Sequence, residues 1–365
     1  MTSSATHPLE LWNAADLSGV ALDHVKHLRL TDCEPACLAQ IPPHIESLTL
    51  TTRRPGPPVE LDLADGALAA LIVSTNPARP IRFTRLPRAL RRLQLTGDVN
   101  PAEIPATLQE LSLWSCTFPT PLRVTAASLR RLVVFDPRTT PEHALAIEAL
   151  PPALEDLWLS VCTIERLPDP LPPLNILHFG ESDLRLVAWD RLPSSLSTLN
   201  AYRCLVREPV ALTSLAGPTH ANFNLCNLTD ARDLVANRAL SVLYLQGNPL
   251  SDETVAAAKA SRRGGPKVKV SRPNDLALTR RMYELGIGLS ATHDGAKKIR
   301  LYHPLGSAIE SFPREVVEEA MTCVTAGERL AGMAFIERVQ ARTNEAKQRE
   351  REARKAAKQA QKTTS

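Results

Sequence analysis

Residues 150–164, LPPALEDLWLSVCTI, contain the unit from which most of the chain is built. The stretch follows the pattern [Leu/Ile]-Pro-x-x-Leu-x-x-Leu-x-Leu-x-x-[Asn/Cys]-x-apolar, and variants of it recur from about residue 20 to about residue 250. We call the first Leu of each Leu-x-Leu pair the anchor. The average anchor spacing of about 21.5 residues indicates a stack of repeated units. The eleven anchors are Leu28, Leu48, Leu71, Leu93, Leu111, Leu132, Leu157, Leu177, Leu199, Phe223 and Leu243.

Each Leu-x-Leu pair predicts a short β-strand, because side chains alternate between the two faces of a strand and both Leu then point the same way. One such strand cannot bury its Leu side chains alone, so stacked copies should form a parallel sheet over a continuous Leu core. Pro stands six residues before several anchors, where it favours an extended, polyproline-like return path over a helix. These residues are Pro42, Pro87, Pro105, Pro151 and Pro193.

The residue five places after the anchor is Asn or Cys in more than half of the copies. Such a residue at the strand end can turn inward and donate to backbone carbonyls that the sheet leaves unpaired. This predicts structural roles for Cys33, Cys116, Cys162 and Cys204. Cys33 and Cys37 are alternatively interpreted as a pair of metal ligands, although two cysteines without a second pair are weak evidence for a zinc site. Asn227 falls one place early, which predicts a local irregularity over 222–228.

The unit resembles the Leu-Pro repeats of the bacterial leucine-rich-repeat class, found in type III secretion effectors of the YopM and IpaH type and in related plant-pathogen effectors. The resemblance implies an α/β fold: a leucine-rich-repeat solenoid with a parallel β-sheet on its concave face and a mostly non-helical convex side. IpaH-type effectors also carry a ubiquitin-ligase domain with a Cys-x-Asp site. Because none of the seven Cys here is followed by x-Asp, we expect no ligase domain.

The composition favours a soluble protein in a reducing compartment. Seven Cys in 365 residues do not make a disulfide framework. No apolar run reaches the roughly 18 residues of a membrane span, and the start, MTSSATHPLE, lacks the pattern of a secretory signal peptide. The net charge of +4 is concentrated after residue 337, so the near-neutral body gives a nucleic-acid role no support. We therefore expect the bacterial cytoplasm or, for an effector, the host cytosol.

Searches for catalytic motifs argue against an enzyme. HExxH, GxSxG and GxxxxGK[ST] patterns are absent from the sequence. The stretch from Gly286 to Ala291 fits a loose GxGxxA dinucleotide pattern, but it lacks the preceding strand that gives this motif its meaning. Cys323 lies in a stretch with helical spacing, where packing is the expected role. We expect no catalytic residue, no metal site and no cofactor.

The residues between the buried Leu positions should form an exposed face, and the middle repeats place large aromatics there. Two of the four Trp residues fall on this face. Exposed aromatic and Arg side chains are typical of protein-binding hot spots, although neighbouring aromatics on adjacent strands also stack and stiffen a sheet. The candidate partner-binding residues are Arg92, Gln94, Trp114, Arg131, Phe135, Trp158, His178, Asn200, Tyr202 and Tyr244.

The ends of the chain predict a different organisation. Residues 1–20 form a tail and cap in which Leu9, Leu11, Trp12 and Leu17 cover the first Leu layer. The solenoid spans 21–250, and 251–273 close it with a helix capped by Ser251 or Asp252 and a last strand at 268–270. Residues 274–340 show helical spacing and predict a small helical region. Residues 341–365 predict a basic tail that is a solvated helix or disordered. Its Lys and Arg residues are compatible with contacts to acidic surfaces, and a plain solubilising tail is the favoured alternative.

Three functions are compatible with this sequence. The first is a non-enzymatic protein–protein interaction module, a secreted effector that binds a host protein through the concave face. The second is an intracellular bacterial scaffold that uses the helical end for assembly. The third is an effector whose enzymatic activity lies in residues 274–340. The repeat class together with the aromatic face favours the first.

Overall fold

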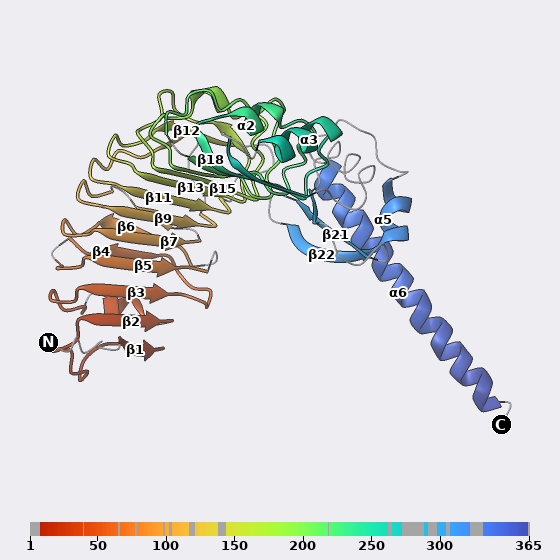
Figure 1. The fold of residues 1–365 in the computed structure, drawn as a ribbon. Coiled ribbons are helices and arrows are strands. Elements are labelled where there is room, and N and C mark those ends of the chain that lie inside the picture. Colours follow the sequence, from red (N-terminus) through yellow and green to blue (C-terminus); the bar gives the residue numbers. More distant parts are fainter. Residues whose placement is uncertain are drawn as a thin grey trace, which may run out of the picture. The chain divides into compact units, whose positions relative to one another are not determined.

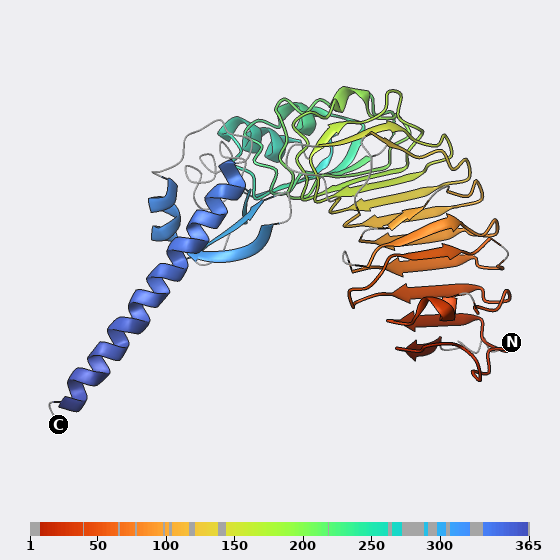
Figure 2. The same cartoon turned by 180° about the vertical axis from the view of Figure 1, so that it is seen from behind.

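The structure is a computed structural model of the 365-residue chain (Figures 1 and 2). It describes residues 8–38, 40–64, 66–76, 79–97, 99–101, 104–116, 121–137, 144–217, 219–261, 265–271, 288–290, 298–303, 307–321 and 331–363. The chain divides into two compact units. The first comprises Met1–Gly180, Leu186–Asn200 and Leu212–Thr219, and the second comprises Glu181–Arg185, Ala201–Ala211 and His220–Ser365.

The main feature is a sheet to which each repeat contributes one strand, as the Leu-x-Leu pairs predict. Within the first unit, adjacent strands of this sheet pair in parallel. Each anchor there lies opposite the anchor of the next repeat, as Leu132 does opposite Leu157. Figure 1 shows these strands side by side. The sheet has 13 strands in the order β1 (Leu9–Trp12), β2 (His27–Thr31), β3 (Ser47–Thr51), β5 (Ala70–Ser74), β7 (Arg92–Thr96), β9 (Glu110–Trp114), β11 (Arg131–Phe135), β13 (Asp156–Ser160), β15 (Ile176–Gly180), β16 (Thr198–Asn200), β17 (Thr219–Asn222), β18 (Leu240–Gln246) and β19 (Lys267–Ser271).

The core is the stack of anchor residues and of the residues two places further on. Leu132, Val134, Leu157 and Leu159 each have 0% of their surface exposed. Burying one such side chain contributes about 1.5–3 kcal/mol, so the stack supplies a large part of the folding free energy. The parallel solenoid architecture predicted from the sequence is confirmed.

The return segments between the main strands are extended, but several are hydrogen-bonded strands rather than the unpaired polyproline-like path expected from the sequence. Alternating apolar residues, such as Val59 and Leu61 at 2% and 4% exposure, give these segments a buried face and let them pair. They form two small parallel sheets. One contains β4 (Val59–Asp62), β6 (Ile81–Arg85) and β8 (Val99–Pro101); the other contains β10 (Leu122–Arg123), β12 (Leu145–Ala149) and β14 (Ile164–Arg166).

The Pro six residues before the anchor begins a turn that leads directly into the strand. The Pro151 carbonyl accepts a hydrogen bond from the Leu154 N–H at 3.1 Å, and Pro105 and Leu108 are joined in the same way at 3.0 Å. A Pro at the first position of the turn needs no N–H of its own. The Leu-Pro-x-x-Leu signature is therefore a turn followed by a core residue.

Two columns of residues end the strands. The residue four places after the anchor has a positive φ in nine copies: Asp32, Gly97, Ser115, Asp136, Val161, Glu181, Arg203, Asn227 and Gly247. The next residue turns inward, as predicted. Cys116 and Cys162 are 1% exposed, and the Cys116 thiol donates to the Leu95 carbonyl with a sulfur–oxygen distance of 3.4 Å.

The second unit contains the end of the repeats and its caps. The irregularity predicted over 222–228 is present, because β17 ends at Asn222, before the anchor Phe223, and Leu225 has a positive φ in addition to the regular one at Asn227. The helices here are α2 (Arg232–Ala236) and α3 (Asp252–Ala260). Ser251 caps α3 by accepting a hydrogen bond from the Thr254 N–H, and β19 closes the repeats by pairing in parallel with β18.

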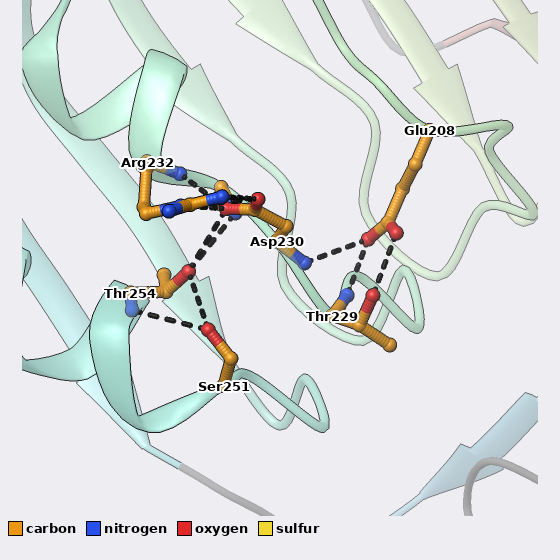
Figure 3. Close-up of polar contacts among 7 residues, drawn as sticks. Glu208, Thr229, Asp230, Arg232, Ser251 and Thr254 are labelled. Atoms are coloured by element: carbon orange, nitrogen blue, oxygen red, sulfur yellow. Dashed lines mark hydrogen bonds and ion pairs between the residues drawn. The ribbon is translucent and has the colours of Figure 1, made fainter.

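A polar network ties the loops of this unit together (Figure 3). The carboxylate of Glu208 accepts hydrogen bonds from the backbone N–H and hydroxyl of Thr229 and from the N–H of Asp230. Asp230 accepts from the Arg232 guanidinium at 2.6 Å and from the Thr254 hydroxyl at 3.2 Å. These bonds hold the pKa of Asp230 at about 2, below its usual value of 3.8, with the Arg232 hydrogen bond as the largest cause.

The region after residue 273, for which the sequence predicts a small helical unit, contains strands as well as helices. It contains an antiparallel sheet of β20 (Gly288–Ser290), β21 (Lys298–His303) and β22 (Ser307–Pro313), followed by α5 (Arg314–Met321) and α6 (Ala331–Thr363). The alternation in KIRLYH and SAIESFP fits strands, and the helical stripe begins only at α5. Phe312, Val316, Val317, Phe335 and Val339 are buried. Gly286 and Cys323 lie outside the described residues.

The N-terminal cap also differs from its prediction. β1 pairs in parallel with β2, and Leu17 is buried, but Trp12 is 52% exposed and stacks against the Arg53 guanidinium instead of covering the first Leu layer. The short helices α1 (Pro35–Leu38) and η1 (Trp189–Arg191) complete the elements. No helix in the described part of the chain is both long and apolar enough to span a membrane.

Candidate partner-binding face

The candidate site is the outward face of strands β9, β11, β13, β15 and β16 in the first unit. Because the anchor side chains point inward, the residues one and three places after each anchor point out of the sheet. Trp114, Phe135, Trp158, His178 and Asn200 therefore lie on one surface, which we call the aromatic face. None of these five side chains is fully buried.

Trp114 and Phe135 form the more accessible half of this face. They occupy matching positions of β9 and β11, which pair in register. Their ring centroids are 4.8 Å apart and the rings are tilted by 31°. Trp114 remains 37% exposed, which makes it one of three large hydrophobic side chains with this degree of exposure among the described residues. Trp114 therefore gives this pair an accessible apolar surface.

Trp158 is held differently, between two neighbours. The Arg131 guanidinium lies 5.2 Å from the indole centroid, and the His178 ring stacks on the indole at 4.3 Å with 14° between the planes. The Trp158 indole N–H is buried and finds no acceptor among the described residues. Trp158 therefore fits the alternative expectation that neighbouring aromatics stack and stiffen the sheet. It presents its edge rather than a free ring face.

His178 is fixed in turn by its surroundings. The Asn200 side-chain nitrogen lies 3.1 Å from His178 Nδ1. A Cβ atom added to Gly180 would come within 2.9 Å of His178 Nε2 and 3.1 Å of Ser160 Oγ, so only glycine leaves room for this ring position. Burial lowers the pKa of His178 below its usual value of 6.5, and the ring is therefore neutral at pH 7.

No family model and no curated protein matches this sequence. The fold and the geometry of the face therefore carry the functional argument by themselves. The architecture is that of a repeat protein with one parallel strand per repeat, and the leucine-rich-repeat pattern accounts for its core and for its strand ends.

Charged residues border the aromatic face along the position before each anchor. Arg92 on β7 pairs with Glu110 on β9 at 2.7 Å, and the hydrogen bond that the guanidinium donates to Glu110 raises the pKa of Arg92. Burial raises the pKa of Asp156, although Arg131 opposes the change. Gln94, also on β7, is half-buried. These residues give the aromatic face a polar rim.

Two predicted site residues belong to the second unit. Tyr202 follows β16 and lies 5.0 Å from the Arg203 guanidinium carbon, and Tyr244 on β18 lies 5.0 Å from the Lys269 amine. Both contacts are cation–π interactions, each worth about 0.5–1 kcal/mol at an exposed site.

The sequence did not single out two positions that shape this region. Val161 follows the Trp158 strand with a φ of +57°, a conformation that β-branched residues rarely adopt. Leu186, 62% exposed, lines a pocket with residues 164–169 of the first unit. Leu186 lies outside the repeat core, so the repeat pattern does not point to it. Val161 occupies the column four places after the anchor, where Asp, Ser and Gly indicate a positive φ but Val does not.

The described residues show no group suited to metal binding, since no cluster of three His, Cys, Asp or Glu side chains occurs among them. The cysteines that the repeat pattern places inward, Cys33, Cys116, Cys162 and Cys204, are buried. Burial raises the pKa of the Cys226 thiol to about 12 and also raises that of Cys37. A thiol that stays protonated at pH 7 is a poor nucleophile.

Proposed function

We propose that this chain is a non-enzymatic protein-binding module and that the aromatic face receives the partner. The Trp114–Phe135 pair carries the proposal, because Trp114 is exposed and its ring contacts the half-buried Phe135 on a paired strand. The Arg92–Glu110 ion pair borders these two rings. An exposed aromatic anchor with a polar rim is the composition typical of interface hot spots. A rigid strand also reduces the entropy lost on binding.

Replacing both Trp114 and Trp158 with Ala tests this proposal by affinity capture. A hot-spot residue contributes at least about 2 kcal/mol, so loss of Trp114 alone should weaken capture roughly 30-fold. Trp12→Ala is a matched control, because Trp12 is exposed but lies on β1, outside the aromatic face. Capture that is equally strong with all variants would remove the support for this face.

Within the same proposal, the protein is a secreted bacterial effector and its partner is a host protein. The support is the resemblance of the repeats to the Leu-Pro units of type III effectors. A reporter fused to the chain should reach host cells from a strain with an intact type III system and not from a secretion-deficient strain. Retention of the reporter in both strains would favour an intracellular scaffold instead.

A further inference from the structure

A second surface lies on the C-terminal helix α6. Its first part is packed: Phe335 and Val339 are buried, and Arg342 pairs with Glu319 of α5 at 2.7 Å. From Asn344 onward the side chains whose burial is described, 344–349 and 351–353, are all exposed. α6 continues to Thr363, so about 20 further residues of helix follow the packed part (Figure 1).

The composition of this extension favours a helix by itself. It consists almost entirely of Ala, Glu, Gln, Lys and Arg, the strongest helix formers. Side-chain contacts one turn apart add to this, as between Gln348 and Glu352 at 3.0 Å. Its apolar residues are alanines only, so it lacks the Trp, Phe or Leu with which amphipathic helices enter a membrane surface.

The basic residues of the extension fall on one side of the helix. With 3.6 residues per turn, six of them lie within an arc of about 100° that continues for about 22 Å along the axis. The acidic positions Glu345, Glu350 and Glu352 fall outside this arc. Arg349, which pairs with Glu345 at 3.5 Å, also falls outside it. The six positions, which we call the basic stripe, are Lys347, Arg351, Arg354, Lys355, Lys358 and Lys362.

We infer that the basic stripe binds the phosphate backbone of duplex nucleic acid. A straight row of cations complements the regular row of phosphates in a duplex, where a negative charge occurs about every 1.7 Å along the axis. Phosphate contacts of this kind require no base-reading side chains and give binding that does not depend on sequence. This function is separate from the aromatic face and does not rest on the proposed protein partner.

The test measures binding of the full chain to a labelled 24-bp DNA duplex and to the corresponding RNA duplex by fluorescence polarisation, between 50 and 200 mM salt. Six phosphate contacts predict a log–log salt slope of about −5, so affinity should fall about 10³-fold across this range. The duplex that the protein binds more tightly is the nucleic acid that supplies the phosphates. Undetectable binding of both at 50 mM salt would overturn the inference.

Two variants separate the stripe from net charge. Replacing Arg351, Arg354, Lys355 and Lys358 with Gln should reduce the salt slope to about −2. The matched control exchanges Lys355 with Ala356 and Lys358 with Ala357, which keeps the composition and moves two charges out of the arc. It should reduce the slope by about 2, whereas an unchanged slope would mean that the stripe has no role. The far-UV circular dichroism of each variant checks that the helix is intact.

A third arm uses vesicles that contain phosphatidylserine, because an anionic membrane offers the same charge. The duplex should bind more tightly than the vesicles and should displace the protein from them. Tighter binding to vesicles, or failure of the duplex to displace the protein, would contradict the assignment to nucleic acid.

Discussion

Replacing Asn248 with Ala should be among the most damaging single changes to a polar residue of the repeats. Asn248 is fully buried, and its side chain donates to the Phe223 carbonyl at 2.7 Å. Its oxygen accepts from the backbone N–H groups of Cys226 at 2.9 Å and Leu228 at 3.0 Å. The substitution removes these three hydrogen bonds, and each bond lost at a buried group costs about 1–3 kcal/mol. We expect the free energy of unfolding to fall by about 3 kcal/mol or more.

Asn76→Ala is the matched control, because Asn76 occupies the same place in its repeat. Its side chain donates to the Arg53 carbonyl at 2.7 Å in an exposed bond, which predicts a loss of about 1 kcal/mol. Thermal unfolding should show a drop of about 6 °C or more for Asn248→Ala and a smaller drop for Asn76→Ala. Hydrogen exchange should accelerate at the Cys226 and Leu228 amides. Equal losses in the two variants would refute the reasoning from buried hydrogen bonds.

Three further predictions concern the strand ends and acid stability. Val161→Asn should raise the free energy of unfolding by about 1 kcal/mol, because Asn tolerates the left-handed backbone. Gly97→Ala should lower it, since φ is +90° there and a Cβ would come within 2.6 Å of the Thr75 carbonyl oxygen; denaturant titration measures both. The folded pKa of Asp230, about 2, lies below its usual 3.8, so this carboxylate stabilises the fold above that usual value and the contribution is lost as the pH falls toward 2. Asp230→Asn should therefore flatten the acid limb of a stability–pH curve, and an unchanged limb would contradict the role given to the network in Figure 3.

The repeat register was predictable because it depends on side-chain period alone. The anchors, the inward Cys column and the Ser251 cap all follow from local pattern. The left-handed column was partly visible in Asp32, Gly97 and Asp136, but Val161 and Arg203 conceal it, since neither favours that conformation. At Val161 and Arg203 the packing of neighbouring turns imposes the left-handed conformation. Such tertiary constraints are not visible in a single sequence.

The candidate site was predictable as a set of outward positions and not as a set of contacts. Alternation along β9 and β13 places Trp114 and Trp158 on the same face. Rotamers then decide that Trp158 is sandwiched between Arg131 and His178 while Trp114 stays open. The strands at 288–313 were missed because their alternation is short and adjoins the helical stripe of α5.

The affinity of a captured partner for three forms of the protein tests the central claim most directly. Isothermal titration should give a Kd for Trp114→Ala roughly 30-fold weaker than that of the wild type, while Trp12→Ala binds like the wild type. A Kd unchanged by Trp114→Ala, or weakened equally by Trp12→Ala, would contradict the assignment of partner binding to the aromatic face.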